Sequence, residues 1–217
     1  MLQDSYKLKG KRKQLVKELK MQGITSQQVL GALEKVPRHF FFPEDFIEKA
    51  YENIAFPIDE GQSISQPYTV AFQTQLLDIQ PNENVLEIGT GSGYQAAILK
   101  VLGADVYSIE TKKLLHTRAK QLFKKLGLNV KCFYGDGSEG LQQHAPYHKI
   151  ILTAAAPKLM KSLTEQLHIG GKLVAPVGSK NVQNMILITR VGENEYTKEK
   201  YGNFTFVPLT GTHGWKD

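Results

Sequence analysis

Three glycines follow a short apolar run in VLEIGTGSGYQ, residues 85–95. Gly89, Gly91 and Gly93 lack a Cβ atom, so the backbone can turn tightly there and approach a ligand closely. A dinucleotide-binding turn would carry its third glycine at position 94. Because that position holds Tyr94, the spacing disfavours a nicotinamide oxidoreductase.

Two acids flank this turn and indicate which groups the ligand carries. Glu87 lies two residues before the first glycine, where a carboxylate can accept from an ammonium group and would repel a pyrophosphate. Glu110 ends the next apolar run, about 20 residues on, where a carboxylate can bind ribose hydroxyls. An amino-acid ammonium and a ribose on one ligand describe S-adenosyl-L-methionine. The turn and both acids therefore predict this cofactor, with S-adenosyl-L-homocysteine as its product.

A further loop, YGDG, follows the next apolar run. Asp136 can bind the exocyclic amine of adenine, and Gly137 allows a close approach of the backbone. Taken alone, the loop is explained by a plain Asp-Gly turn.

The elements that position these residues begin near residue 84, where strand-like and helical runs alternate. VLEIG, DVYSIE, VKCFYGD and HKIILTAA predict strands, and YQAAILKVL and KLLHTRAKQLFKKLG predict helices. Such alternation implies a mostly parallel sheet with helices on both faces. GGKLVAPVG, QNMILITRV and NFTFVPL then follow with little helix between them. We expect an α/β fold, a doubly wound and mostly parallel sheet that ends in antiparallel C-terminal strands.

The first 80 residues have a different pattern, helical and rich in loops. KLKGKRKQLVKELK and ITSQQVLGALEKV predict helices, and Pro37 ends the second. PEDFIEKAY predicts a short helix that begins at Pro43. We expect residues 1–80 to form an N-terminal helical and loop segment packed on a cofactor-binding core of residues 81–217, effectively one domain.

Seven blocks of the sequence match one family in order and at the family's spacing. They are VPRHFFFP, GQSISQPYTVA, VLEIGTGSGYQAA, VYSIE, GDG, TAAAP and GGKLVAPVG. On these blocks the sequence resembles the protein-L-isoaspartate (D-aspartate) O-methyltransferases over nearly its whole length. The resemblance implies a Rossmann-like methyltransferase fold. It also implies methyl transfer from S-adenosyl-L-methionine to the free α-carboxylate of L-isoaspartyl residues in damaged proteins and peptides, which initiates repair through a succinimide.

The resemblance also implies the functional residues. It assigns the family's active-site serine to Ser65, in the loop GQSISQPY, where the hydroxyl would orient an acceptor carboxylate that is already ionised at neutral pH. Without the resemblance, Ser65 is an ordinary loop hydroxyl that caps a helix starting near Pro67. The cofactor-binding positions are Glu87, Gly89, Thr90, Gly91, Gly93, Glu110, Asp136 and Gly137.

Three positions depart from the family's pattern. Ser63 stands where threonine is usual, Asp59 where glycine is common, and His148 where aspartate is common. Asp59 and His148 lie outside the matched ligand positions, and Ser63 keeps a hydroxyl. The departures bear on substrate preference and leave the predicted reaction unchanged.

A net charge of +6 is also compatible with an alternative function, that of an S-adenosylmethionine-dependent nucleic-acid methyltransferase. Much of the excess lies in residues 7–20, which a solvated helix face explains, and no aromatic residues interleave with these lysines. The loop after the fourth strand reads TAAAPK, where amino-directed base methylases carry an Asn-Pro-Pro-Tyr type loop. We therefore expect isoaspartyl proteins and peptides as substrates, without nucleic acid or an obligate partner.

The sequence predicts a cytoplasmic protein without a metal. It contains no apolar run of membrane-spanning length, and the first residues, MLQDSYKLKGKRK, are charged where a signal peptide is apolar. His144 and His148 have metal-ligand spacing for a helix, but Pro146 lies between them and breaks that helix.

Overall fold

The computed structural model describes residues 3–215. The α-helices in this range are α1 (Tyr6–Met21), α2 (Gln27–Lys35), α3 (Pro67–Leu77), α4 (Tyr94–Val101), α5 (Lys113–Leu126) and α6 (Lys161–Thr164). The strands are β1 (Phe56–Pro57), β2 (Ser63–Ile64), β3 (Asn84–Ile88), β4 (Asp105–Glu110), β5 (Lys131–Tyr134), β6 (Tyr147–Leu152), β7 (Leu167–Gly178), β8 (Gln183–Arg190) and β9 (Tyr196–Phe204). Short 3-10 helices are η1 (Arg38–Phe41), η2 (Glu44–Lys49), η3 (Asp59–Gly61), η4 (Gly137–Glu139) and η5 (Gln142–His144).

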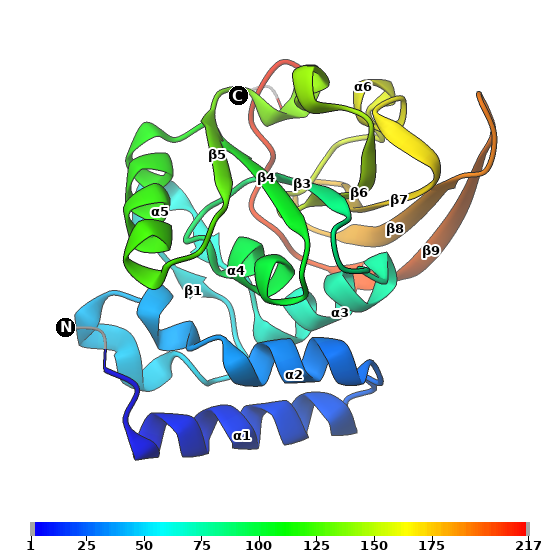
Figure 1. Cartoon of the computed structure of the whole chain (residues 1–217). Helices are drawn as coiled ribbons and strands as arrows, with labels where there is room; N and C mark the ends of the chain where they lie inside the picture. Colours follow the sequence, from blue (N-terminus) through cyan, green and yellow to red (C-terminus); the bar gives the residue numbers. More distant parts are fainter. Residues whose placement is uncertain (1–2, 216–217) are drawn as a thin grey trace.

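A seven-stranded sheet in the order β5-β4-β3-β6-β7-β8-β9 forms the centre of the molecule (Figure 1). Strands β3 to β7 run parallel, and β8 and β9 add antiparallel strands at one edge. The predicted fold class is confirmed. The strand order reverses at β3, which lies between β4 and β6, and this is where ligands bind in open α/β sheets.

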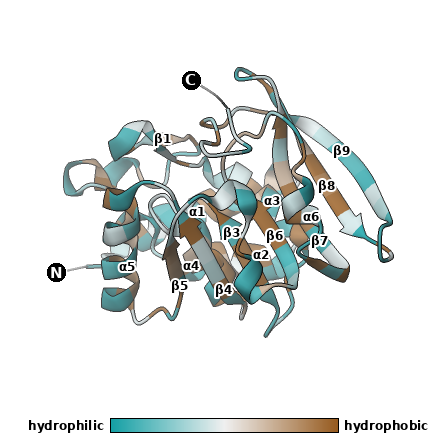
Figure 2. Ribbon diagram, turned by 90° about the horizontal axis from the view of Figure 1, so that it is seen from above, coloured by the Kyte–Doolittle hydropathy of each residue, from teal (hydrophilic) through white to brown (hydrophobic). Residues whose placement is uncertain are grey.

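Successive residues of β3 point to opposite faces of the sheet and enter two separate cores. Val85 belongs to the larger core, on the face that α3 and α4 cover, whereas Leu86 and Ile88 belong to the core that includes Leu163 of α6. Figure 2 shows hydrophobic residues on the central strands and mainly hydrophilic residues on β9. Both faces of the central strands are therefore buried, as a parallel sheet requires.

The N-terminal helices add an outer layer on the larger core. In Figure 1, α1 lies outermost, against α2, and α2 lies against α3 and α4. Helix α2 begins after Ser26, whose hydroxyl accepts from the amide of Val29 at 3.3 Å. It ends at Lys35 because Val36, which precedes Pro37, adopts an extended conformation. Leu19 of α1 shares one core with the sheet residue Val85.

Two of the predicted elements differ in the structure. PEDFIEKAY forms the 3-10 helix η2 in place of an α-helix. The last strand was expected at NFTFVPL, yet β9 ends at Phe204, so this prediction is wrong for residues 205–209. That segment leaves the sheet edge because its backbone bonds to the loop after β6: Ala155 donates to the carbonyl of Val207, and Leu209 donates to the carbonyl of Ala155, both at 2.8 Å.

Within residues 3–215, no helix is long and apolar enough to cross a membrane. The same residues contain no group of three or more His, Cys, Asp or Glu side chains that could hold a metal ion. His144 packs against the rings of Tyr107 and Phe133, with centroids 4.9 and 5.2 Å away. His148 packs against His168 at 4.4 Å. The two histidines that share metal-ligand spacing therefore have different neighbours.

Candidate functional site

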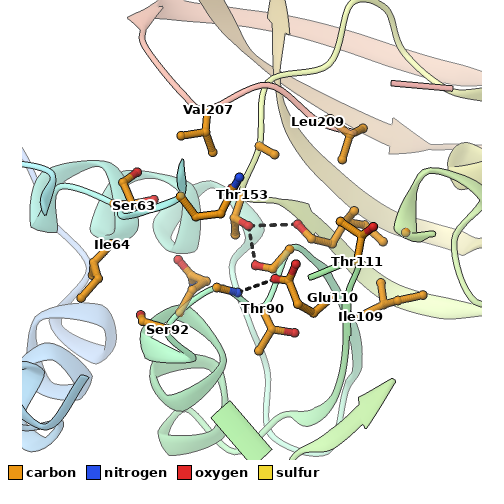
Figure 3. A pocket seen from close by; sticks show the side chains of 18 of the residues that line it. Ser63, Ile64, Thr90, Ser92, Ile109, Glu110, Thr111, Thr153, Val207 and Leu209 are labelled. Carbon is orange, nitrogen blue, oxygen red and sulfur yellow. Dashed lines mark hydrogen bonds between the residues drawn. The ribbon is translucent and has the colours of Figure 1, made fainter. Parts of the chain in front are cut away.

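A cavity lies at the carboxyl ends of β3, β4 and β6, where the strand order reverses. Figure 3 shows Ser63 and Ile64 on one side of it, Glu110 and Thr111 on the other, and Val207 and Leu209 above. Six segments that are separate in the sequence contribute to its lining. The lining residues are Gln62, Ser63, Ile64, Ser65, Val70, Ile88, Gly89, Thr90, Gly91, Ser92, Tyr94, Gln95, Ile109, Glu110, Thr111, Gly137, Thr153, Ala154, Val207, Pro208, Leu209 and Thr210.

The glycine turn after β3 forms the floor of this cavity and requires residues without Cβ atoms. Gly89, Gly91 and Gly93 have φ angles of 96°, 53° and 88°, in the left-handed region that favours glycine. A Cβ atom on Gly89 would lie 2.5 Å from Oγ1 of Thr153, and one on Gly93 would lie 2.6 Å from the ring of Phe123. Both positions are therefore closed to larger residues by conformation and by space.

Glu110 lies in the cavity lining and also fixes the turn. Its Oε2 atom accepts from the amide of Gly91 at 2.8 Å (Figure 3). Its Oε1 atom accepts from the amide of Lys112, also at 2.8 Å. The residue is 5% exposed, so these hydrogen bonds are shielded from water. The carboxylate is thereby held at the end of β4, facing the same space as the turn.

Glu87 lies outside the cavity lining, and its contact with a ligand ammonium group stays a prediction. Alternation along β3 turns its side chain to the same face as Val85, where it is fully buried. The Ser108 hydroxyl donates to its Oε2 atom, and Thr90 and Ser108 share a hydrogen bond of 2.5 Å. Its Oε1 atom has no hydrogen-bond partner among the described residues. Burial raises the pKa of Glu87 to about 8, and Glu110 adds to this shift.

Asp136 and Gly137 have different positions relative to the cavity. Gly137 lines it, and a Cβ atom there would lie 2.7 Å from Cγ2 of Ile88. Asp136 lies outside the lining, and its carboxylate accepts from the amides of Ser138 at 2.8 Å and Thr212 at 2.7 Å. These backbone contacts lower the pKa of Asp136 against the opposing effect of burial. The Asp136 carboxylate is thus hydrogen-bonded to Thr212, in the segment that directly follows the wall residues 207–210.

Ser65 and Ser63 line this cavity and also a second one, of about 850 Å³, on the far side of their loop. The other residues around the second cavity are Ala55, Gln66, Tyr68, Thr69, Phe72, Val182, Gly202, Asn203, Phe204, Thr205 and Phe206. Helix α3 has Gln66 at its N-cap and no side-chain capping bond, so Ser65 does not cap that helix. The carbonyl of Ser65 instead accepts from Nη2 of Arg38 at 2.8 Å.

Two further contacts hold the walls of the cavity in place. The loop GQSISQPY, residues 61–68, is called the serine loop below. Asp59 in η3, just before it, forms an ion pair with Arg118 in α5, which ties the start of the serine loop to the helix after β4. On the opposite wall, Nε1 of Trp215 donates to the carbonyl of Ala155 at 3.1 Å, next to residues 207–210. Asp59, a departure from the family's pattern, thus has a structural contact of its own.

The structure brings most of the predicted site residues to one cavity. The predicted residues in its lining are Ser65, Gly89, Thr90, Gly91, Glu110 and Gly137, whereas Glu87, Gly93 and Asp136 are outside the lining. Sequence reasoning did not identify Thr153 or residues 207–210 as part of the site. Thr153 could have been identified from the sequence, because it directly follows a parallel strand next to the glycine turn. Residues 207–210 had no such signal, since NFTFVPL has the alternation of an ordinary strand.

Comparisons with known proteins agree on one family. The family model described as protein-L-isoaspartate(D-aspartate) O-methyltransferase matches residues 10–214. A protein-L-isoaspartate O-methyltransferase of Cytophaga hutchinsonii is 50% identical over 214 residues, which cover 99% of this chain and 97% of the relative. A protein of the same name from Christiangramia forsetii is 51% identical over 209 residues, 96% of this chain and 98% of the relative.

Solved structures show the same likeness in three dimensions. A protein-L-isoaspartate O-methyltransferase superposes with a TM-score of 0.84 at 26% identity, covering 94% of this chain and 67% of the other. A Plasmodium falciparum protein assigned to the same enzymes, in complex with S-adenosyl-L-homocysteine, has a TM-score of 0.79 at 22% identity. That match covers 92% of this chain and 98% of the other, and it supports the fold.

The buried carboxyl of Glu87 predicts a pH-dependent loss of stability. Its pKa is about 8 in the folded chain against an ordinary value of about 4.5, so the folded state binds more protons between these values. Its contribution to stability is therefore complete below about pH 4.5 and is lost as the pH rises to about 8. Glu87→Gln cannot ionise, so we expect the variant to gain stability relative to the wild type between about pH 5 and about pH 8.

Urea unfolding at about pH 5 and at about pH 8 measures this difference in the free energy of unfolding. Glu139→Gln, at an exposed acid outside the cavity lining, controls for the loss of one carboxyl group. A stability difference between wild type and Glu87→Gln that is the same at both pH values would contradict the prediction.

Proposed function

Because the chain belongs to the protein-L-isoaspartate(D-aspartate) O-methyltransferase family, we propose which of its residues perform the family's reaction. The enzyme transfers a methyl group from S-adenosyl-L-methionine to the free α-carboxylate of L-isoaspartyl residues in damaged proteins and peptides. One observation carries the residue assignment. The cavity over the glycine turn and the larger second cavity meet at Ser63 and Ser65.

The first cavity fits S-adenosyl-L-methionine. Gly89, Gly91 and Gly137 let the backbone approach a ligand, and the Glu110 carboxylate is available to ribose hydroxyls at the end of β4. Glu87 and Asp136 support the site from behind, through Ser108 and the amide of Thr212 respectively. When bound, the cofactor supplies an electrophilic methyl group on a sulfonium.

The second cavity fits a peptide that reaches Ser65 from outside. It combines aromatic side chains, Phe72, Phe204 and Phe206, with polar groups such as Asn203. Binding sites of this kind use apolar walls for affinity and a few polar groups for orientation. An isoaspartyl carboxylate held there would lie across the serine loop from the cofactor cavity.

Ser65 acts by orientation. An α-carboxylate has a pKa near 3.5 and is ionised at neutral pH, so methyl transfer needs no general base. The Ser65 hydroxyl donates to one oxygen of that carboxylate and leaves the other free to attack. Correct placement of two reacting groups can supply several kcal/mol of the barrier reduction.

Residues 207–210 exclude water from the reacting groups. Val207 and Leu209 lie over the cofactor cavity, opposite the glycine turn (Figure 3). Because opposite charges cancel as the methyl group moves, an environment of low polarity favours the reaction over the separated ions. The apolar wall therefore has a role in the reaction as well as in cofactor binding.

The site does not favour a nucleic-acid acceptor. Among residues 3–215, neither cavity has a lysine or an arginine in its lining. The basic residues of α1 lie in the outermost layer (Figure 1), where Lys7 and Lys11 pair with Glu48. A backbone of phosphates would need cations beside the reacting groups. The rival nucleic-acid methyltransferase therefore has no feature of the cavities in its favour.

Residues 1–80 and 81–217 act as one unit in this proposal. The serine loop comes from the first segment and the glycine turn from the second, and Ser65 and Gly89 line one cavity. The enzyme accordingly needs no obligate partner to complete its site. The cytoplasmic location predicted from the sequence stays a prediction, which fractionation of the host cells would test.

The decisive experiment uses the purified chain alone, with methyl-tritiated S-adenosyl-L-methionine and three acceptors: an isoaspartyl peptide, its normal aspartyl twin, and bulk RNA. We expect label on the isoaspartyl peptide. In mild alkali the neighbouring amide nitrogen attacks the new ester, closes a succinimide and releases methanol. The label should therefore become volatile while part of the peptide returns to a normal aspartyl linkage. Equal label on the aspartyl twin, or alkali-stable label on RNA, would reject the proposed acceptor.

Glu110→Ala is expected to weaken S-adenosyl-L-homocysteine binding. The change removes a ribose acceptor and also the two hydrogen bonds that fix the amides of Gly91 and Lys112. Hydrogen bonds to a charged group contribute about 1.5–3 kcal/mol, so the loss should exceed about 1 kcal/mol. Isothermal titration calorimetry measures it, with Glu139→Ala as the control. An unchanged dissociation constant would remove Glu110 from the cofactor site.

Ser65→Ala is expected to separate turnover from cofactor binding. The variant loses the donor to the acceptor carboxylate, so kcat should fall roughly tenfold or more, while cofactor affinity stays within a few-fold. Ser26→Ala removes the cap of α2, far from both cavities, and should lower stability without changing kcat. Steady-state methylation of the isoaspartyl peptide provides the measurement. Wild-type turnover in Ser65→Ala would end the assignment.

A further inference from the structure

Arg38 is a fully buried arginine without an acidic partner in the described part of the chain. It lies at the start of η1 and is 0% exposed. Its Nη2 atom donates to the carbonyl of Ser65 at 2.8 Å, while Nε and Nη1 find no hydrogen-bond partner among residues 3–215. A buried charge with so few partners is costly, so an account of its role has to explain that cost.

Two aromatic rings provide most of the environment of this guanidinium. Its Cζ atom lies 4.7 Å from the ring centroid of Tyr94 and 5.3 Å from that of Phe42. Aromatic faces attract a cation, and they do so more strongly where water is excluded. Burial lowers the pKa of Arg38 to about 10, which still leaves it charged at neutral pH. The charge is therefore retained close to two aromatic rings and hydrogen-bonded to one carbonyl.

The three groups that Arg38 contacts belong to different parts of the site. Tyr94 is the first residue of α4, directly after the glycine turn, and it lines the cofactor cavity. Ser65 carries the hydroxyl that meets both cavities. Phe42 belongs to the N-terminal layer and packs against the larger core. The guanidinium thus joins the serine loop to the cofactor turn through one side chain.

Few other contacts fix the backbone at Ser65. The preceding residue, Ile64, is buried and pairs with Phe56 in the two-stranded sheet of β1 and β2. The following residue, Gln66, donates through Nε2 to the carbonyl of Asn53 at 2.9 Å. At Ser65, which lies between these two residues, the hydrogen bond from Arg38 determines the orientation of the peptide group that follows. A rotation of that peptide group would displace the hydroxyl relative to the cofactor cavity.

We propose that Arg38 is a positioning residue for methyl transfer. By donating to the carbonyl of Ser65 while it stacks on Tyr94, it sets the place of the Ser65 hydroxyl relative to the bound cofactor. This inference rests on the proposed role of Ser65 in orienting the acceptor carboxylate. It explains why a charged side chain is kept where an apolar one would avoid the cost of burial.

Arg12 provides a matched control, because it is a second buried arginine in the N-terminal layer and is only 7% exposed. It pairs with Asp4 at 2.9 Å and donates to the Tyr51 hydroxyl at 3.0 Å. It has no hydrogen bond to the serine loop. Removing one member of such a buried pair is destabilising. Arg12→Met should therefore lose stability and keep kcat, whereas Arg38→Met should keep stability and lose kcat.

The test compares the wild type, Arg38→Met, Arg12→Met, Ser65→Ala and the Arg38→Met/Ser65→Ala double variant. Thermal unfolding, calorimetric affinity for S-adenosyl-L-homocysteine, and kcat and KM on an isoaspartyl peptide are measured for each. For Arg38→Met we expect kcat to fall roughly tenfold, with cofactor affinity and peptide KM within a few-fold of wild type. Because Arg38 acts through Ser65, its loss should change kcat by less than about twofold in the Ser65→Ala background.

Two outcomes would overturn the proposal. One is a wild-type kcat in an Arg38→Met variant that folds. The other is a double variant whose fold loss in kcat equals the product of the losses in the two single variants, because the two residues would then act independently. Where Arg38→Met does not fold, Arg38→Lys replaces it in the same cycle, since lysine keeps the charge but lacks the planar fork that stacks and donates together. Wild-type kcat in Arg38→Lys would likewise reject the role. Inactivity of the wild type on the isoaspartyl peptide would instead refute the proposed function.

Discussion

The turn from Gly89 to Gly93, whose three glycines adopt left-handed φ angles, is the constraint on which the rest of the site depends. Side chains hold this turn from two directions: Thr153 donates to the carbonyl of Gly89 at 2.6 Å, and Glu110 accepts from the amide of Gly91. The ring of Phe123 occupies the space next to Gly93. Because these neighbours come from the residue after β6, from β4 and from α5, the turn has its shape only when the sheet is assembled. The cofactor cavity is therefore a property of the whole sheet.

Two ionisable groups buried near this turn respond to burial in opposite ways. Glu87 takes up a proton, because its pKa of about 8 lets it become neutral near physiological pH. Arg38 keeps its charge at a pKa of about 10 and is stabilised by the faces of Phe42 and Tyr94. A neutral acid suits a supporting position behind the turn. A retained cation suits a position that must direct a carbonyl group.

The sequence was sufficient for the order of the main elements and for six of the residues that line the cofactor cavity. Alternation of strand-like and helical runs predicted the parallel sheet, and the glycine spacing located its ligand-binding turn. The side-chain direction of Glu87 was also present in the sequence, since Val85 and Glu87 must share a face of β3. The contact of Glu87 with a ligand ammonium group stays a prediction. Residues 205–209 were not predictable in the same way, because their partner is Ala155, a long-range contact that local alternation does not encode.

The hydrogen bonds at Asp136 also bear on how the enzyme ages. In an Asp-Gly pair the backbone nitrogen of the glycine can attack the side-chain carboxyl, because glycine presents no side chain to obstruct the approach. Asp136 and Gly137 form such a pair inside the cofactor site of an enzyme that acts on the product of this rearrangement. The amides of Ser138 and Thr212 hold both carboxylate oxygens, so the carboxyl group must leave both before it can cyclise. These two hydrogen bonds therefore oppose spontaneous isomerisation at this Asp-Gly pair in the enzyme's own backbone.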